Sequence, residues 1–232
     1  MNPITSMNEK EAELIGMHVG DGTLYLAGNG QVPVWELRGS ITEQEFYEHV
    51  KNLIKEIFDI EVKPKYRGPN SYGIQTTNKI ITLFFLDNGF KPGTKTYTVR
   101  IPDYIKTAEI NMKRAFIRGL FDTDGCICFD KNRTAFHYYP KMEFNFASKD
   151  LRDDLVLLLN ELGFKVHQWN TTRDKELSFR LCAAGFETLE KLQKEIIPAN
   201  SKHLKRIENG LKNKEKVSLK PRHKSLKVPN NT

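Results

Sequence analysis

The chain has 232 residues, a formal net charge of +7 and 39% hydrophobic residues, enough to bury the core of one large domain or two small ones. Cys126, Cys128 and Cys182 show no Cys-x-x-Cys spacing, so the sequence indicates neither a zinc site nor a disulfide framework. The N-terminus lacks an apolar signal segment, and no apolar run approaches the ~20 residues of a membrane span. We expect a cytoplasmic protein with no membrane partner, without excluding expression in an organelle.

The first hundred residues predict a fixed order of elements. Ser6 and Glu9 have the spacing of a capping box, which predicts a helix that ends at Gly20-Asp21-Gly22. The patterns that follow predict two strands, a helix, two strands and a helix. Their expected ranges are 23–27, 34–41, 46–58, 60–67, 72–77 and 78–87. This segment therefore reads as αββαββα.

The second hundred residues repeat this order. The segment LIGMHVGDG at residues 14–22 returns as IRGLFDTDG at residues 117–125, so that Asp21 and Asp124 lie 103 residues apart. The elements expected after the second copy are strands at 126–130 and 141–147, a helix at 150–162, strands at 164–169 and 177–182, and a helix at 186–196. We predict an α+β protein of two pseudo-symmetric halves, residues 1–100 and 101–200.

Residues 201–232 form a basic C-terminal tail. They carry ten Lys and Arg against two Asp and Glu, whereas residues 1–200 carry 26 against 27. Because the tail has little apolar content, we expect a mobile arm that binds a polyanion rather than a packed element. The alternative is a disordered, solubilising end.

Strand alternation predicts a polar sheet surface opposite the helices. Its residues are mostly hydrogen-bond donors, and Glu36, Glu61 and Glu143 are a minority. Such a surface offers phosphate and base-edge contacts to DNA in a major groove. The alternative is an ordinary solvated face. With Lys149 added, the candidate DNA-binding residues are Arg38, Ser40, Lys63, Lys65, Arg67, Gln75, Lys141, Asn145, Lys149, Lys165, His167 and Arg180.

The paired motif predicts a metal site. Gly16, Gly20 and Gly119 would let the two motif helices approach closely, so that Asp21 and Asp124 converge. Two carboxylates repel unless a cation lies between them, and a hard cation such as Mg²⁺ (or Mn²⁺) suits oxygen ligands. The candidate metal-binding residues are Asp21, Asp124, Gly20 and Thr123. Such a site favours hydrolysis of phosphodiester bonds.

The two copies resemble the paired signature of the LAGLIDADG homing endonucleases, and residues 117–125 are the closer match. The resemblance extends over about residues 8–205 and includes residues 201–205, which are similar to archaeal members. It implies a monomeric pseudo-dimer whose two antiparallel sheets form a DNA-binding saddle, with Asp21 and Asp124 as the metal-binding aspartates. It also implies basic groups beside the metals.

Lys95 and Lys202 follow the last helix of each half at similar distances from the aspartates, so they are the candidate catalytic lysines beside Asp21 and Asp124. Lys149 is a weaker candidate, because its counterpart region at residues 42–45 contains no lysine. His18 is matched by Phe121 in the second copy and is expected to be a buried, satisfied histidine at the interface. Asp122 is expected to be structural.

Three functional readings follow. We favour a site-specific, metal-dependent endonuclease of double-stranded DNA, with intron RNA as a second candidate partner. The absence of an intein-like Cys or Ser start and His-Asn finish favours a free-standing, intron-encoded enzyme. The alternatives are a non-cleaving RNA maturase or DNA-binding regulator on the same scaffold, and a general basic nucleic-acid-binding protein.

Overall fold

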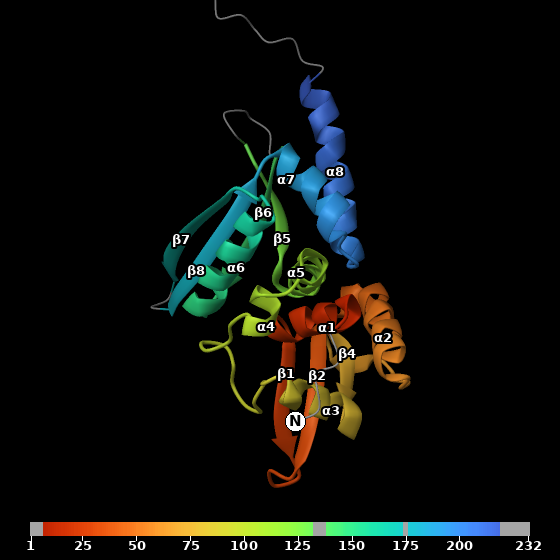
Figure 1. The fold of residues 1–232 in the computed structure, drawn as a ribbon. Coiled ribbons are helices and arrows are strands. Elements are labelled where there is room, and N and C mark those ends of the chain that lie inside the picture. Colours follow the sequence, from red (N-terminus) through yellow and green to blue (C-terminus); the bar gives the residue numbers. More distant parts are fainter. Residues whose placement is uncertain (1–6, 132–137, 174–175, 219–232) are drawn as a thin grey trace, which may run out of the picture.

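A computed structural model describes residues 7–131, 138–173 and 176–218 of the chain (Figure 1). It confirms the mixed α+β class, with two four-stranded antiparallel sheets. In the first half the elements are α1 (Glu9–Val19), β1 (Gly22–Ala27), β2 (Val32–Ser40), η1 (Ile41–Glu43), α2 (Gln44–Phe58), β3 (Lys65–Gly68), β4 (Ser71–Thr76) and α3 (Lys79–Asp87).

The second half begins with a short helix, α4. Its elements are α4 (Asp103–Lys106), α5 (Ile110–Asp124), β5 (Cys126–Asp130), β6 (Tyr139–Phe146), α6 (Lys149–Glu161), β7 (Val166–Arg173), β8 (Glu176–Ala184), α7 (Phe186–Lys191), the π-helical segment η2 (Leu192–Ile196) and α8 (Ser201–Ser218). The predicted order αββαββα is therefore present in both halves.

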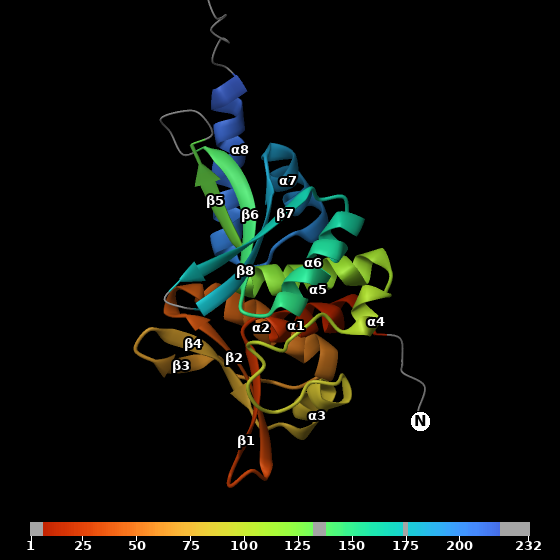
Figure 2. The same ribbon diagram turned by 90° about the vertical axis from the view of Figure 1, so that its left-hand side faces the viewer.

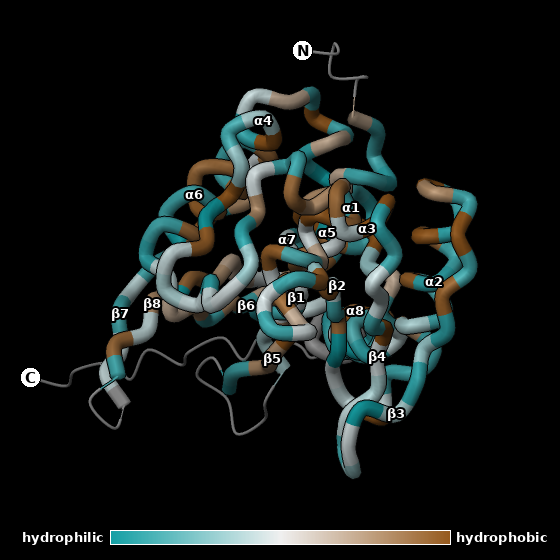
Figure 3. Tube along the Cα trace, turned by 90° about the horizontal axis from the view of Figure 1, so that it is seen from below, coloured by the Kyte–Doolittle hydropathy of each residue, from teal (hydrophilic) through white to brown (hydrophobic). Residues whose placement is uncertain are grey.

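The two sheets share one topology. Their strand orders are β1-β2-β4-β3 and β5-β6-β8-β7. The strands lie to the left in Figure 2, and helices α3, α4 and α6 lie to the right. We call the sheet surface that points away from the helices the outer face. In Figure 3 the hydrophobic segments recur along the helices, whereas the β3–β4 hairpin is mostly hydrophilic to neutral.

The closest contact between the halves is the crossing of α1 and α5. A Cβ atom added to Gly16 would lie 2.1 Å from the carbonyl oxygen of Phe116, and one added to Gly119 would lie 2.0 Å from that of Glu13. Only glycine allows this approach, as predicted for both positions. Because the helices cross here, their C-terminal ends lie side by side.

Several predicted boundaries are wrong. The cap of α1 is Asn8, whose side chain and that of Glu11 form the capping box, and the predicted Ser6 lies outside the described residues. The strand predicted at 60–67 is reduced to β3, because Pro64 has no N–H to donate to a sheet. The helix predicted at 186–196 changes to π-helical geometry after Lys191.

The tail from Ser201 is not a mobile arm over its first part. Residues 201–218 form α8, whose His203 and Ile207 side chains are buried and whose Gly210 packs against Phe129 and Leu189. The many charged residues of this segment obscured a narrow apolar stripe in its sequence. Burial of that stripe offsets the conformational entropy lost when the helix forms. Within the described ranges, no helix is long and apolar enough to cross a membrane.

The α1–α5 contact predicts that Gly119→Ala destabilises the protein. The new methyl group would meet the Glu13 carbonyl, so overpacking should lower the free energy of unfolding by about 1–3 kcal/mol, as measured by urea titration. Asn111→Ala on the exposed surface of α5 is the control and should change stability little. Equal stability of Gly119→Ala and the wild type would contradict the close contact.

Candidate metal-dependent active site

The two motif aspartates occupy equivalent places at the ends of α1 and α5. Asp124 is the last residue of α5, and Asp21 follows Gly20, the C-terminal cap of α1. A Cβ atom on Gly20 would lie 3.3 Å from Cγ of Asp124 and 2.1 Å from the Thr123 hydroxyl oxygen. The cap of one helix therefore touches the aspartate of the other.

Electrostatics confirm that the two carboxyl groups share one environment. Burial and then the charge of Asp21 raise the pKa of Asp124 to about 7. Burial and then the charge of Glu43 raise the pKa of Asp21, although its side chain retains exposed surface. Lys95 and Lys202 oppose both shifts. The structure thus brings together all four residues that the sequence nominated as catalytic.

The two lysines are held in different ways. The Lys95 ammonium donates to the carbonyl oxygens of Val19 and Gly20 at 2.6 and 2.5 Å, at the C-terminal end of α1. Burial lowers the pKa of Lys95, and the charges of Asp124 and Asp21 oppose this effect. Lys202 instead forms an ion pair with Glu43 at 2.6 Å. The site is therefore not symmetric.

Glu43 and Asn200 were missed as site residues. The Asn200 amide donates to Oε1 of Glu43 at 2.8 Å, and its backbone N–H donates to Asp122 at 3.0 Å. Burial acts to raise the pKa of Glu43, but hydrogen bonds from Lys202 and Asn200 outweigh it and lower that pKa. The spacing of Ser40 and Glu43, which form a capping box, was the sequence signal that Glu43 has a fixed position.

The donor set fits a hard divalent cation. Asp21 and Asp124 supply carboxylate oxygens, and the Gly20 carbonyl next to Asp21 already accepts from Lys95. The Glu43 oxygens are already bonded to Lys202, Asn200 and the Ser40 N–H, and the Thr123 hydroxyl bonds to its own helix. In the described part of the chain, no three acidic, His or Cys side chains form a metal-binding cluster. Water and phosphate oxygens would therefore complete the coordination.

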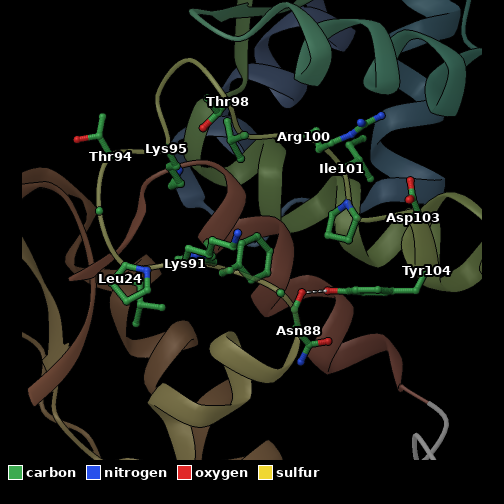
Figure 4. Close-up of a pocket in the computed structure, with 17 residues that line it drawn as sticks. Leu24, Asn88, Lys91, Thr94, Lys95, Thr98, Arg100, Ile101, Asp103 and Tyr104 are labelled. Atoms are coloured by element: carbon green, nitrogen blue, oxygen red, sulfur yellow. Dashed lines mark hydrogen bonds between the residues drawn. The ribbon is translucent and has the colours of Figure 1, made fainter. Parts of the chain in front are cut away.

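A cavity of about 580 Å³ lies behind the site, lined largely by the segment between the halves (Figure 4). Lys91, Lys95 and Arg100 contribute positive charge to its wall, and the Tyr104 hydroxyl donates to the Asn88 carbonyl at 3.4 Å. Lys95 also lines a second pocket that contains Asp21. Lys95 therefore lines both the cavity and the pocket that contains Asp21.

The outer faces carry two polar networks, each centred on a glutamate at an equivalent register. Glu36 pairs with Thr23 on β1, and Glu143 pairs with Cys126 on β5, so each glutamate lies opposite the residue two positions after its aspartate. Each binds an arginine: Glu36 binds one from β3, two strands away, and Glu143 binds one from the adjacent strand β8. Arg67 donates to Glu36 at 3.3 Å and to Gln75, and Arg180 donates to Glu143 and lies over the Trp169 ring. The two arginines therefore have fixed orientations.

The strand registers locate the other predicted DNA-binding residues. Lys149 is the first residue of α6 and pairs with Asp153, so it does not lie on a sheet. Lys63 and Lys165 precede β3 and β7 rather than lying within them. The residues on the outer faces are Arg38, Ser40, Lys65, Arg67, Gln75, Lys141, Asn145, His167 and Arg180.

His18 and Asp122 have structural partners, as predicted. His18 is buried and accepts a hydrogen bond from the Trp35 indole at 3.2 Å, but it packs on Phe85 and Phe90 in the first-half core rather than at the interface. Burial lowers the pKa of His18 to about 3. Asp122 accepts the backbone N–H groups of Ala199 and Asn200, which positions the start of α8.

Comparison with known proteins agrees with this architecture. Residues 111–196 match the family model of the LAGLIDADG-like domain. The homing endonuclease I-DmoI in complex with DNA and Mn has a TM-score of 0.55 at 18% identity, covering 82% of this chain and 96% of its own. I-SmaMI, bound to an uncleaved DNA target with calcium ions, has a TM-score of 0.60 at 11% identity, covering 93% and 95%. The resemblance to the LAGLIDADG homing endonuclease family is confirmed.

Two curated relatives match this chain over 150 residues or more, but they are themselves much longer proteins. The glutamine–fructose-6-phosphate aminotransferase of Methanocaldococcus jannaschii is 25% identical over 181 residues, which are 73% of this chain and 16% of that protein. The tRNA-splicing ligase RtcB of Methanopyrus kandleri is 25% identical over 150 residues, or 59% of this chain and 15% of the ligase. The chain thus spans about a sixth of each relative.

The raised pKa of Asp124 predicts that Asp124→Asn stabilises the metal-free protein. The folded state holds a proton up to a pH of about 7, whereas the unfolded state loses it near 4, so unfolding free energy should fall as pH rises between these values. In EDTA at pH 8, Asp124→Asn should gain about 1–3 kcal/mol and show a weaker pH dependence, while Asp21 and Asp122, whose pKa values are also raised, keep part of it.

Asp87→Asn, which changes the exposed last residue of α3, is the matched control and should leave both properties unchanged. Added Mg²⁺ should raise the thermal midpoint of the wild type and of the control, but not that of Asp124→Asn. A less stable Asp124→Asn protein in EDTA would contradict the repulsive site.

Proposed function

We propose that this protein is a site-specific endonuclease that uses a divalent metal to cut both strands of double-stranded DNA. The observation that carries the proposal is the convergence of Asp21 and Asp124, with Lys95 and Lys202 beside them. Neither a structural core nor a simple basic binding surface needs two such aspartates at one point. The neighbours I-DmoI, I-SmaMI and I-LtrWI were each solved with DNA, which supports the same partner here.

The chain's own residues supply the remaining chemistry. A bound Mg²⁺ or Mn²⁺ would lower the pKa of water and stabilise the leaving oxygen. Asp21 and Asp124 would hold the ion, and its charge would remove the repulsion between them. Lys95 and Lys202 would place positive charge beside the scissile phosphate. Glu43 and Asn200 would act as positioning residues, since they orient Lys202.

We propose that the outer faces read the DNA sequence. Arg67 and Arg180 are held by Glu36 and Glu143, so their remaining N–H groups are preorganised for a base edge. The two glutamates lie at equivalent registers from the two aspartates along the strands. Because Arg67 lies on the edge strand β3 and Arg180 on the inner strand β8, we expect them to contact base pairs at different positions in the two half-sites.

The curated relatives support a mobile element. An aminotransferase, an RNA ligase and a protein of the ATP synthase of Pyrococcus abyssi share little chemistry, yet each contains a matching segment of 15–17% of its length. A transferable segment explains this pattern better than any of those activities. We propose an intron as the setting of this chain, unlike that of the relatives, whose matching segments lie within a longer polypeptide. A gene that lies inside an intron supports that setting, and a reading frame fused to a host protein contradicts it.

Cleavage tests the metal proposal directly. Incubation with DNA of the uninterrupted locus should give two fragments with Mg²⁺ and none with EDTA. Asp21→Asn and Asp124→Asn should each reduce the cleavage rate by at least about 100-fold while DNA binding persists, because the amide keeps the shape but loses the anionic ligand. Asp87→Asn is the control and should cut normally.

Cleavage in EDTA, or wild-type rates for either aspartate variant, would contradict the mechanism. Binding without cleavage by the wild-type protein would instead favour the DNA-binding regulator. Binding confined to structured intron RNA would favour the maturase.

Sequence readout is tested by selecting bound duplexes from a randomised pool. Arg67→Ala and Arg180→Ala should each relax the preference at one position, with a loss of about 1–3 kcal/mol in discrimination. Lys79→Ala removes an exposed cation on α3 in the helix layer and should leave all preferences intact. Unchanged preferences in both arginine variants would show that the two networks only stabilise the sheets.

A further inference from the structure

Helix α8 is a fixed element that begins at the candidate active site. Its second residue, Lys202, pairs with Glu43. The His203 ring packs on Phe121 with a centroid distance of 4.4 Å, and Ile207 is fully buried. At Gly210 a Cβ atom would lie 2.4 Å from the Leu189 side chain, so the helix is seated closely on the second half.

The opposite side of α8 is basic. Lys205, Arg206 and Lys212 are exposed, and Glu208 is the one acidic side chain among the described residues 201–214. Arg206 donates to the Ile127 carbonyl, which fixes its side chain beside β5. Over the described ranges, Lys205 and Lys212 have no ion-pair partner, so their charge remains available to a ligand.

The spacing of these cations follows from helical geometry. Lys205 and Lys212 are seven residues apart, at i and i+7, and therefore lie on one side of the helix. The 18 residues of α8 span about 27 Å, or roughly eight base pairs of B-DNA. In Figure 1, α8 lies on the side of β5 opposite α6, and its Gly210 packs against Phe129 of β5 and Leu189 of α7, so the helix flanks the second sheet at its β5 edge.

The first half has no such helix. There, α3 is followed by residues 88–102, which contain no helix and line the cavity at the seam. The two halves therefore match in their sheets and differ at this flank. The cations of α8 have a fixed spacing and lie beside the second half only. They therefore fit the phosphates of one DNA strand.

We propose that the exposed side of α8 binds the phosphate backbone of DNA that flanks the second half-site. This inference rests on the proposed DNA-binding function. Long, solvated lysine side chains can neutralise phosphates but do not fix a base contact, so α8 adds affinity without changing sequence preference. It makes the contact with DNA longer on one side of the cut than on the other.

The test compares full-length Lys205→Gln/Lys212→Gln with a matched control, Lys79→Gln/Lys194→Gln, which removes the same charge from exposed positions on α3 and η2. Affinity for a random-sequence duplex is measured over a range of KCl concentrations. The α8 variant should reduce the slope of log affinity against log salt by about 1.8, because two phosphate contacts are lost. The control should keep the wild-type slope, and circular dichroism should show equal folding.

An unchanged slope in the α8 variant overturns the inference while leaving the proposed function intact. Failure of the wild-type protein to bind any duplex DNA overturns the proposed function itself. A loss confined to structured RNA would overturn the DNA assignment of this surface. Hydroxyl-radical footprints on a cleavable target should show protection lost on one side only, and a symmetric loss would likewise contradict the inference.

Discussion

The contact between the backbones of α1 and α5 is the constraint on which the rest of the structure depends. Gly16 and Gly119 leave no side chain between the helices, so carbonyl oxygens of one helix touch the glycines of the other. This contact brings the two C-terminal ends together and fixes Asp21 beside Asp124. Each sheet then starts directly after its aspartate, so the outer faces keep a defined distance from the candidate metal site.

The same contact places two carboxylates close together, and their repulsion is an electrostatic cost. The residues that offset this repulsion differ between the two halves. Two carboxylates and Glu43 are opposed by Lys95 and Lys202, and the pKa of Asp124 remains raised. Lys95 binds helix-end carbonyls, whereas Lys202 binds a carboxylate. Helix α8 lies beside the second half only. The two halves therefore share their sheets but differ at the candidate metal site and in this additional helix.

The sequence predicted what depends on local pattern and repetition: both motif helices, all eight strands within a few residues, and the two aspartates. It missed Glu43 and Asn200, because their importance arises from residues 157 positions apart meeting in space. The prediction of a mobile arm in place of α8 was wrong, because the many charged residues obscured a sparse buried stripe. This stripe is formed by His203, Ile207 and Gly210. That stripe recurs at helical spacing and was the available signal.

The central claim is that Asp21 and Asp124 act as one metal site. Its most direct test is a double-mutant cycle on Mn²⁺ affinity, measured by electron paramagnetic resonance for the wild type, Asp21→Asn, Asp124→Asn and the double variant. If the aspartates share an ion, either substitution should weaken binding by at least about tenfold, and the second should add little. Two Mn²⁺ ions, each with an affinity that only one of the two substitutions lowers, would contradict the account.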